Sequence, residues 1–209
     1  MRESSWILEP EKFLTKDETS RLLNVARHQA EASLIKGKKI AIRDYFIIHL
    51  ALATGLRVME IAALKCSDIH LNNTVCSLLV RKGKGRKKRQ VLFAGTFKQH
   101  CKEYLKWKRV IGEPLGPEEP LIVSSNTGGH MTTRAIQKVF KRCAERACLY
   151  SAYSIHCLRH TYACFLLKAS KWNVRLVQKQ LGHSRITTTQ VYADVMLPEI
   201  KKALNRLCL

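Results

Sequence analysis

The sequence predicts a mainly α-helical domain that carries one small antiparallel β-sheet. Apolar residues recur at helical spacing over most of the chain, and residues 40–54 are apolar on nearly every side. Two segments rich in valine and leucine, 74–81 and 88–94, flank a loop that contains two glycines, which is the pattern of a β-hairpin. The length of 209 residues suits one domain with a substantial buried core.

The predicted helices begin and end at recognisable cap residues. Thr15 and, three residues later, Glu18 form a capping box at the start of a helix over about 16–33. Gly55 is placed to end the central helix. Further helices are expected at 57–64, 97–109, 132–147, 155–169 and 174–181, from about 185 through Tyr192, and from 198 to about 206.

The segments between the helices supply the sheet and the loops. Besides the two hairpin strands, residues 121–123 are a candidate third strand. Residues 112–120 hold two glycines and three prolines, so they are predicted to form a surface loop. The helix at 132–147 is amphipathic, with an apolar stripe and a basic face that includes Arg134 and Lys138.

Charge is the strongest signal in the composition. Lysine and arginine number 37 against 16 aspartates and glutamates, which gives a formal net charge of +21. A compact domain carries such an excess at a cost in self-repulsion, which a bound polyanion relieves. Nucleic acid is the expected partner, because lysine and arginine release condensed counterions from its phosphates. An acidic membrane surface, or no specific partner at all, is the alternative.

The sequence carries no signal for export, a membrane span or a metal site. The first 15 residues lack an apolar core segment, and residues 40–53 are too short and too charged to cross a bilayer. We therefore expect a cytoplasmic protein whose eight cysteines are reduced. A zinc site at Cys143, Cys148, His156 and Cys157 would lack the paired spacing of structural zinc sites, so we expect neither a metal nor another cofactor.

Two basic motifs are suited to binding phosphate. Arg57 follows the turn at Gly55 and begins a helix, where the helix N-terminus and a guanidinium both favour an anion. A surface arginine paired with Glu60 is the alternative. Seven of the nine residues 81–89 are basic, and two glycines let this loop approach a DNA backbone, where Lys84 could protonate a leaving oxygen. A solvated basic loop is the alternative there.

Two further motifs carry histidines. His156 and Arg159 lie three residues apart on a predicted helix and therefore project together. His183 follows a glycine that frees the backbone to turn, and Tyr192 lies nine residues further on. Each motif alone is equally explained by surface or core packing, and His160 is expected to pack locally.

Taken together, these motifs occur in an order that resembles the active site of the tyrosine recombinases, the phage-integrase family. The resemblance runs from about Leu14 to about Leu204 through TGLRVMEIAAL, GKGRKKR, HCLRHTYACFLL and LGHSRITTTQVY. It implies that residues 13–209 form that family's catalytic domain, α-rich with a three-stranded antiparallel sheet, behind an extension at 1–12. The helical DNA-binding domain that usually precedes this region is not expected, which leaves a short recombinase and the catalytic half of a longer one as alternatives.

The resemblance also implies a role for each residue. Tyr192 resembles the nucleophile that attacks a phosphodiester, forming a 3′-phosphotyrosyl link and a free 5′-hydroxyl. Arg57 and Arg159 look like the pair that holds the non-bridging oxygens, with Glu60 as a structural support. Lys84 is similar to the hairpin lysine that acts as general acid. The two family histidines, which assist proton transfer and phosphate binding, match His156 and His183.

Double-stranded DNA is the implied partner, and the implied chemistry uses neither metal nor ATP. A homotetramer on DNA is the implied assembly, in which residues 198–209 dock on a neighbouring protomer or fold back on their own domain. The side chains expected to contact DNA are Arg81, Lys82, Arg86, Lys87, Lys88, Arg89, Arg134 and Lys138. Two alternatives stay open, a topoisomerase IB-like enzyme that relaxes DNA and a non-catalytic DNA-binding protein of the same fold.

Overall fold

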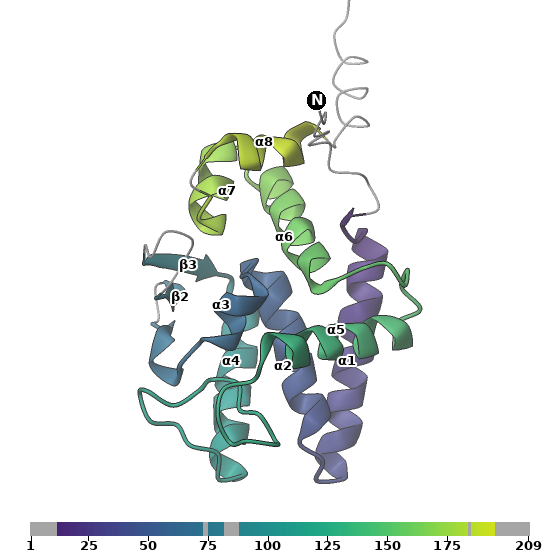
Figure 1. The fold of residues 1–209 in the computed structure, drawn as a ribbon, viewed down its shortest axis with the longest axis vertical. Helices are drawn as coiled ribbons and strands as arrows, with labels where there is room; N and C mark the ends of the chain where they lie inside the picture. The colour runs from purple at the N-terminus through teal and green to yellow at the C-terminus, as the bar shows by residue number, and fades with distance from the viewer. Residues whose placement is uncertain (1–11, 73–74, 82–87, 184, 195–209) are drawn as a thin grey trace, which may run out of the picture.

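Helix α2 (Ile40–Thr54) is the central helix of the larger hydrophobic core. The structure is a computed structural model, and it describes residues 12–72, 75–81, 88–183 and 185–194. The helices in contact with α2 are α1 (Lys16–Ile35), α4 (Gly95–Val110), α5 (Thr133–Arg146) and α6 (Ile155–Ala169) (Figure 1). Phe46, Ile47, Ile48 and Leu50 of α2 are fully buried, which confirms the central position predicted for this helix.

Local capping signals set the ends of α1 and α2 as the sequence predicts. The amide of Thr15 donates to Glu18 Oε2 at 2.8 Å, and the amide of Glu18 donates to Thr15 Oγ1 at 3.2 Å. Gly55 ends α2 in the left-handed region, with φ of 61°. The other helices of the described chain are α3 (Val58–Ala62), α7 (Val174–Leu181) and α8 (Thr187–Asp194). The helices predicted within the described residues are therefore confirmed, with small shifts at their ends.

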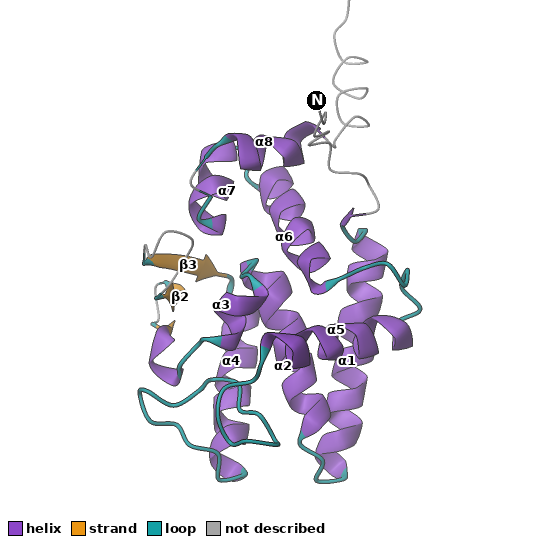
Figure 2. Ribbon diagram, viewed as in Figure 1, coloured by secondary structure: helices purple, strands orange, loops and turns teal. Residues whose placement is uncertain are grey.

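A three-stranded antiparallel sheet is packed beside α2 and α7 through its strand β3 (Figure 2). The strands are, in sheet order, β1 (Ile69–Leu71), β2 (Cys76–Val80) and β3 (Arg89–Phe93). The predicted hairpin is confirmed, and its register pairs Val80 with Arg89. Arg89 therefore enters the sheet directly after the basic loop.

The third strand is not the segment that the sequence favoured. Residues 121–123 are extended and buried, but they make only isolated backbone contacts: Leu121 donates to the carbonyl of Leu64 at 2.9 Å, and Met131 donates to that of Ile122 at 3.3 Å. The prediction of a strand there was wrong, because burial explains the three apolar side chains without sheet pairing. Strand β1 takes the third position instead.

The C-terminal helices form a second, smaller core at one end of α6 (Figure 1). Its buried members are Ala163, Cys164, Leu167, Val177, Leu181 and Tyr192. Helix α7 also contacts β3. The turn after α7 is thereby held close to the strand that follows the basic loop.

Some of the predicted features lie outside the described residues. These are Lys82, Lys84, Arg86, Lys87 and the helix expected at 198–206. Within the described ranges, no helix is long and apolar enough to cross a membrane. No group of three or more histidine, cysteine, aspartate or glutamate side chains in those ranges could hold a metal ion, so the four residues of the zinc alternative do not form a site.

Candidate active site

Arg57 stands at the N-cap of α3, where the chain leaves the Gly55 turn in extended conformation. Its amide donates to Glu60 Oε2 at 2.8 Å, and its Nη1 donates to Glu60 Oε1 at 3.1 Å. The side chain of Glu60 is 4% exposed and that of Arg57 is 29% exposed. The pairing with Glu60, considered above as an alternative to a phosphate-binding role, is therefore part of the site and leaves Arg57 accessible.

Arg159 lies in the middle of the site, on α6, and is buried. Its Nη1 donates to the carbonyl of Gly55 at 2.5 Å, and its Nη2 donates to the carbonyl of Leu181 at 2.8 Å. These two bonds tie the end of α2 to the end of α7. Burial, and next the charge of Arg57, lower the pKa of Arg159 to about 10, so it stays cationic at neutral pH.

Glycine is required at the turn that receives Arg159. A Cβ on residue 55 would lie 2.3 Å from the ring of Tyr162, and the positive φ of Gly55 disfavours other side chains. The close approach of α6 to this turn therefore depends on the absence of a side chain.

His183 lies against Arg159 as a neutral imidazole. Its Nε2 is 3.0 Å from Nη2 of Arg159, and its Nδ1 is 3.0 Å from Thr189 Oγ1. A guanidinium only donates, so Nε2 accepts and the ring proton resides on Nδ1, which donates to Thr189. Burial, followed by the charge of Arg159, lowers the pKa of His183 to about 3.

Tyr192 is buried on α8, with its ring stacked on that of His183 at a centroid distance of 6.3 Å. Its hydroxyl oxygen is 3.0 Å from Nδ1 of His160. Burial raises the pKa of Tyr192 to about 12, although the charge of Arg159 opposes the rise. Burial lowers the pKa of His160 to about 4, so the phenol and its imidazole partner are both neutral.

His160, which was expected from the sequence to pack locally, contacts the hydroxyl of Tyr192. It follows Arg159 directly, but its partner Tyr192 is 32 positions away. That contact depends on how α8 packs on α6, and the only sequence signal for it was adjacency to Arg159.

His156 is exposed near the N-terminus of α6. It lines a pocket between α5 and α6 together with Arg134, Lys138 and Lys141. Two side chains predicted to contact DNA thus share a hollow with a predicted catalytic histidine. His156, which lines this basic pocket, lies three residues before Arg159 on α6.

The remaining hairpin residues have different surroundings. Lys88 is exposed. Arg81 is half-buried, with Nε donating to Asp68 Oδ1 at 2.6 Å and Nη2 to Ser67 Oγ at 3.0 Å. Arg89 donates both terminal nitrogens to Glu60, at 2.8 and 2.9 Å. The predicted phosphate contacts of these three residues stay predictions.

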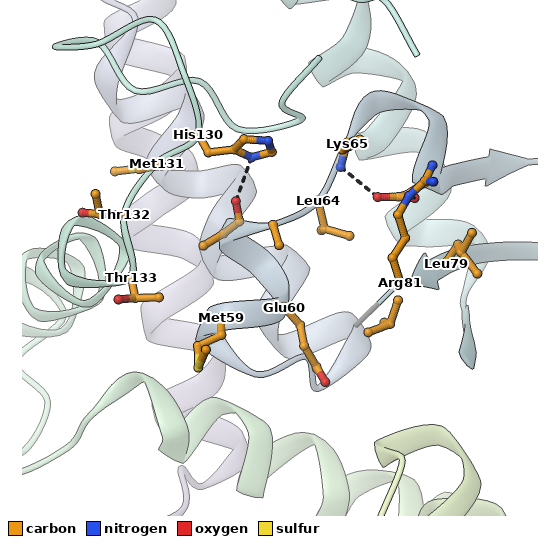
Figure 3. A pocket seen from close by; sticks show the side chains of 14 residues that line it. Met59, Glu60, Leu64, Lys65, Leu79, Arg81, His130, Met131, Thr132 and Thr133 are labelled. Atoms are coloured by element: carbon orange, nitrogen blue, oxygen red, sulfur yellow. Dashed lines mark hydrogen bonds and ion pairs between the residues drawn. The ribbon is translucent and has the colours of Figure 1, made fainter. Parts of the chain in front are cut away.

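A hollow of about 580 Å³ borders the site between α3, the end of β2 and the start of α5 (Figure 3). Glu60 and Met59 line it from α3, Arg81 from the hairpin, and His130 and Met131 from the segment before α5. The hollow therefore lies next to the carboxylate of Glu60, which pairs with Arg57.

The structure therefore brings together three of the six predicted catalytic residues, places a fourth against them and a fifth close by. Arg57, Arg159 and His183 come from separate elements, the charge of Arg57 contributes to lowering the pKa of both Arg159 and His183, and Tyr192 packs on His183. His156 lies at the rim, and Lys84 is outside the described residues. Two guanidiniums beside a neutral imidazole are suited to hold a phosphate group.

The comparisons with known proteins identify the family of the chain. The phage integrase family matches residues 12–197, so the chain belongs to that family. It is 32% identical over 196 residues to tyrosine recombinase XerC of Vibrio parahaemolyticus, covering 93% of this chain and 58% of that protein. It is 31% identical over 189 residues to tyrosine recombinase XerD of Oceanobacillus iheyensis, covering 90% and 59%. The chain thus spans less than two thirds of the length of these relatives.

Solved structures confirm the expected fold. The crystal structure of XerA recombinase superposes with a TM-score of 0.74 at 24% identity, over 97% of this chain and 66% of that one. XerH site-specific recombinase, bound to a palindromic difH substrate in a post-cleavage complex, gives a TM-score of 0.72 at 24% identity, over 93% and 52%. The fold is therefore that of tyrosine recombinase catalytic domains, mainly helical with a small three-stranded antiparallel sheet.

Proposed function

We propose that this chain is the catalytic domain of a tyrosine-type site-specific recombinase, which cleaves and rejoins double-stranded DNA through Tyr192 without metal or ATP. The observation that carries the proposal is the convergence of Arg57, Arg159 and His183 from three separate elements beside Tyr192. The names of the relatives and the net charge of +21 support DNA as the substrate.

The chemistry follows from the charges of these residues. Arg57 and Arg159 hold the non-bridging oxygens of the scissile phosphate and stabilise the added charge of the pentacoordinate transition state. The oxygen of Tyr192 forms a bond to phosphorus while the bond to the 5′ oxygen breaks. Lys84 supplies the proton that the leaving 5′ oxygen takes, and the proton of the phenol passes to one of the two histidines expected to assist proton transfer, His156 or His183. Rejoining reverses these steps.

Tyr192 must move for this attack to occur. Its hydroxyl is hydrogen-bonded to His160 and its side chain is buried, so DNA has to draw the phenol towards the phosphate held by the two arginines.

We further propose that strand exchange takes place in a homotetramer on DNA, with residues 198–209 docking on a neighbouring protomer. A deletion of these residues should then keep cleavage but abolish recombination.

A nicked suicide substrate tests the nucleophile. A nick close to the cut site lets the short fragment diffuse away, so the covalent intermediate accumulates. We expect a protein–DNA adduct with the wild type and none with Tyr192→Phe, measured as a shifted band under denaturing conditions. An adduct in Tyr192→Phe would refute the assignment. No adduct of the wild-type protein on any DNA would favour a non-catalytic DNA-binding protein, and relaxation of supercoiled DNA by a monomer would favour the topoisomerase-like alternative.

A further inference from the structure

The guanidinium of Arg89 joins three elements of the candidate site. Its Nη1 and Nη2 donate to Glu60 Oε1 and Oε2 of α3 at 2.8 and 2.9 Å, a bidentate fork. Its Nε donates to the carbonyl of Gln180 in α7 at 3.3 Å. Arg89 itself begins β3, so one side chain links the hairpin, the helix of Arg57 and the end of α7. Its side chain is 13% exposed.

Glu60 is shared between Arg89 and Arg57. Oε1 accepts from Nη1 of both arginines, and Oε2 accepts from the Arg57 amide and from Nη2 of Arg89. A carboxylate offers about four acceptor positions, so Glu60 is saturated. Burial alone would raise the pKa of Glu60, but the hydrogen bonds from Arg89 and from the Arg57 amide hold it below its usual value, and the group stays charged.

This sharing decides where the guanidinium of Arg57 points. Among the described residues, Nη1 is the one guanidinium nitrogen of Arg57 that makes a hydrogen bond, so Nε and Nη2 remain for a phosphate. Without Arg89, the buried carboxylate of Glu60 would be left with Arg57 as its single cationic partner. A buried carboxylate that has lost part of its hydrogen bonding is costly. Glu60 would therefore attract further guanidinium nitrogens of Arg57 in place of those of Arg89.

Arg89 also packs against the turn that presents His183. A Cβ on Gly182 would lie 2.6 Å from Cδ of Arg89, so the backbone before His183 rests directly on this side chain. The amide of Leu92 donates to Gln180 Oε1 at 3.1 Å, which is a second hydrogen bond between β3 and α7.

From these contacts we infer that Arg89 is a positioning residue, which keeps Glu60 occupied so that Arg57 remains available to the scissile phosphate, and that it does not contact the DNA backbone. The inference rests on the function proposed above. It replaces the phosphate contact that the sequence suggested for Arg89.

The test separates positioning from DNA contact by two measurements on Arg89→Gln. Single-turnover cleavage of the nicked substrate at saturating DNA should slow about 10- to 100-fold, as when an outer residue that orients a reactive group is removed. The slope of log affinity against log salt should stay that of the wild type, whereas loss of a phosphate contact would reduce it by about 0.9. Arg89→Lys, which keeps the charge but not the fork, should give an intermediate cleavage rate.

Arg142→Gln is the matched control. Arg142 pairs with the buried carboxylate of Asp44 between α5 and α2, so its loss costs stability in the same way, away from the site. We expect its cleavage rate to stay within about twofold of the wild type. Adding Glu60→Gln to Arg89→Gln removes the charge that draws in Arg57, and cleavage should recover about threefold or more.

The outcomes are distinct. A wild-type cleavage rate in Arg89→Gln, a reduced salt slope, an equal loss in Arg142→Gln, or no recovery in the double variant would each overturn the positioning role. In all of these cases the wild type still forms its adduct, so the proposed function stands. Absence of the adduct in the wild type itself would remove the proposed function and, with it, this inference.

Discussion

The hydrogen bond between Tyr192 and His160 is the contact that fixes the hydroxyl of the proposed nucleophile in this structure. Tyr192 is 4% exposed, and among the described residues the hydrogen-bond partner of its hydroxyl is Nδ1 of His160, at 3.0 Å. A buried hydroxyl without a partner costs about 1–3 kcal/mol, whereas removing both partners together is close to neutral. The two residues should therefore be energetically coupled.

A double-mutant cycle measures that coupling without reference to catalysis. His160→Leu should lower the free energy of unfolding by about 1–3 kcal/mol, because the phenol is left unsatisfied. Adding Tyr192→Phe should restore part of the loss, giving a coupling energy of about 1 kcal/mol in urea unfolding. Strictly additive effects would mean that Tyr192 does not lie on His160 in the free protein.

At this scale the sequence predicted which residues lie near one another better than it predicted their individual contacts. Arg57, Arg159 and His183 are brought together as the ordered motifs suggested. The contacts of Arg89 with Glu60 and of His160 with Tyr192 were not foreseen, since they join positions 29 and 32 residues apart that meet only when β3 and α8 pack. Neither pair lies within one turn of a helix, where spacing alone indicates proximity.

At the scale of the elements, the turn after α2 is where fold and site depend on each other. Gly55 ends α2, its carbonyl receives Arg159, and the ring of Tyr162 packs where its Cβ would be. Gly37 is a natural comparison, because it has a similar φ of +64° but nothing within 4 Å of a Cβ.

Alanine at these two glycines should therefore have unequal effects. In Gly37→Ala the added methyl group meets no other atom, and the cost is that of an alanine in the left-handed backbone region. This substitution should lower the free energy of unfolding by about 1–2 kcal/mol. Gly55→Ala also forces a methyl group into the Tyr162 ring, which adds about 1–3 kcal/mol, and it displaces the carbonyl that orients Arg159, so cleavage should slow as well. Equal losses of stability in the two variants, with unchanged cleavage in both, would contradict the close approach of α6.

The helices were predictable because their signals are local. A capping box at Thr15 and Glu18, a glycine after α2 and an amphipathic stripe in α5 each act within a few residues. Strands lack such signals when they are short. Ile69–Leu71 is a strand of three residues and was not expected, whereas residues 121–123 are entirely apolar and buried but make only isolated backbone contacts.

At the scale of the whole molecule, one buried and three half-buried imidazoles make stability depend on pH. Burial is the main cause that lowers the pKa of His49 and His160 to about 4 and that of His100 and His183 to about 3. His49 and His100 also meet through their Nδ1 atoms at 2.8 Å, an arrangement that two protonated rings could not keep. The folded protein therefore holds these four rings neutral in mild acid.

The sign of the effect follows from proton binding. In the unfolded chain the same rings have a pKa of about 6.5, so between pH 6.5 and about 4 the unfolded state binds more protons than the folded one. The free energy of unfolding should thus be undiminished above pH 6.5 and fall as the pH is lowered through that window, by about 1.4 kcal/mol per pH unit for each well-buried ring. His100→Gln should remove the contribution of about one ring to this slope in urea unfolding at pH 7, 6 and 5. A slope that His100→Gln does not reduce would mean that this pair does not stay neutral in the fold, and that the acid sensitivity arises elsewhere.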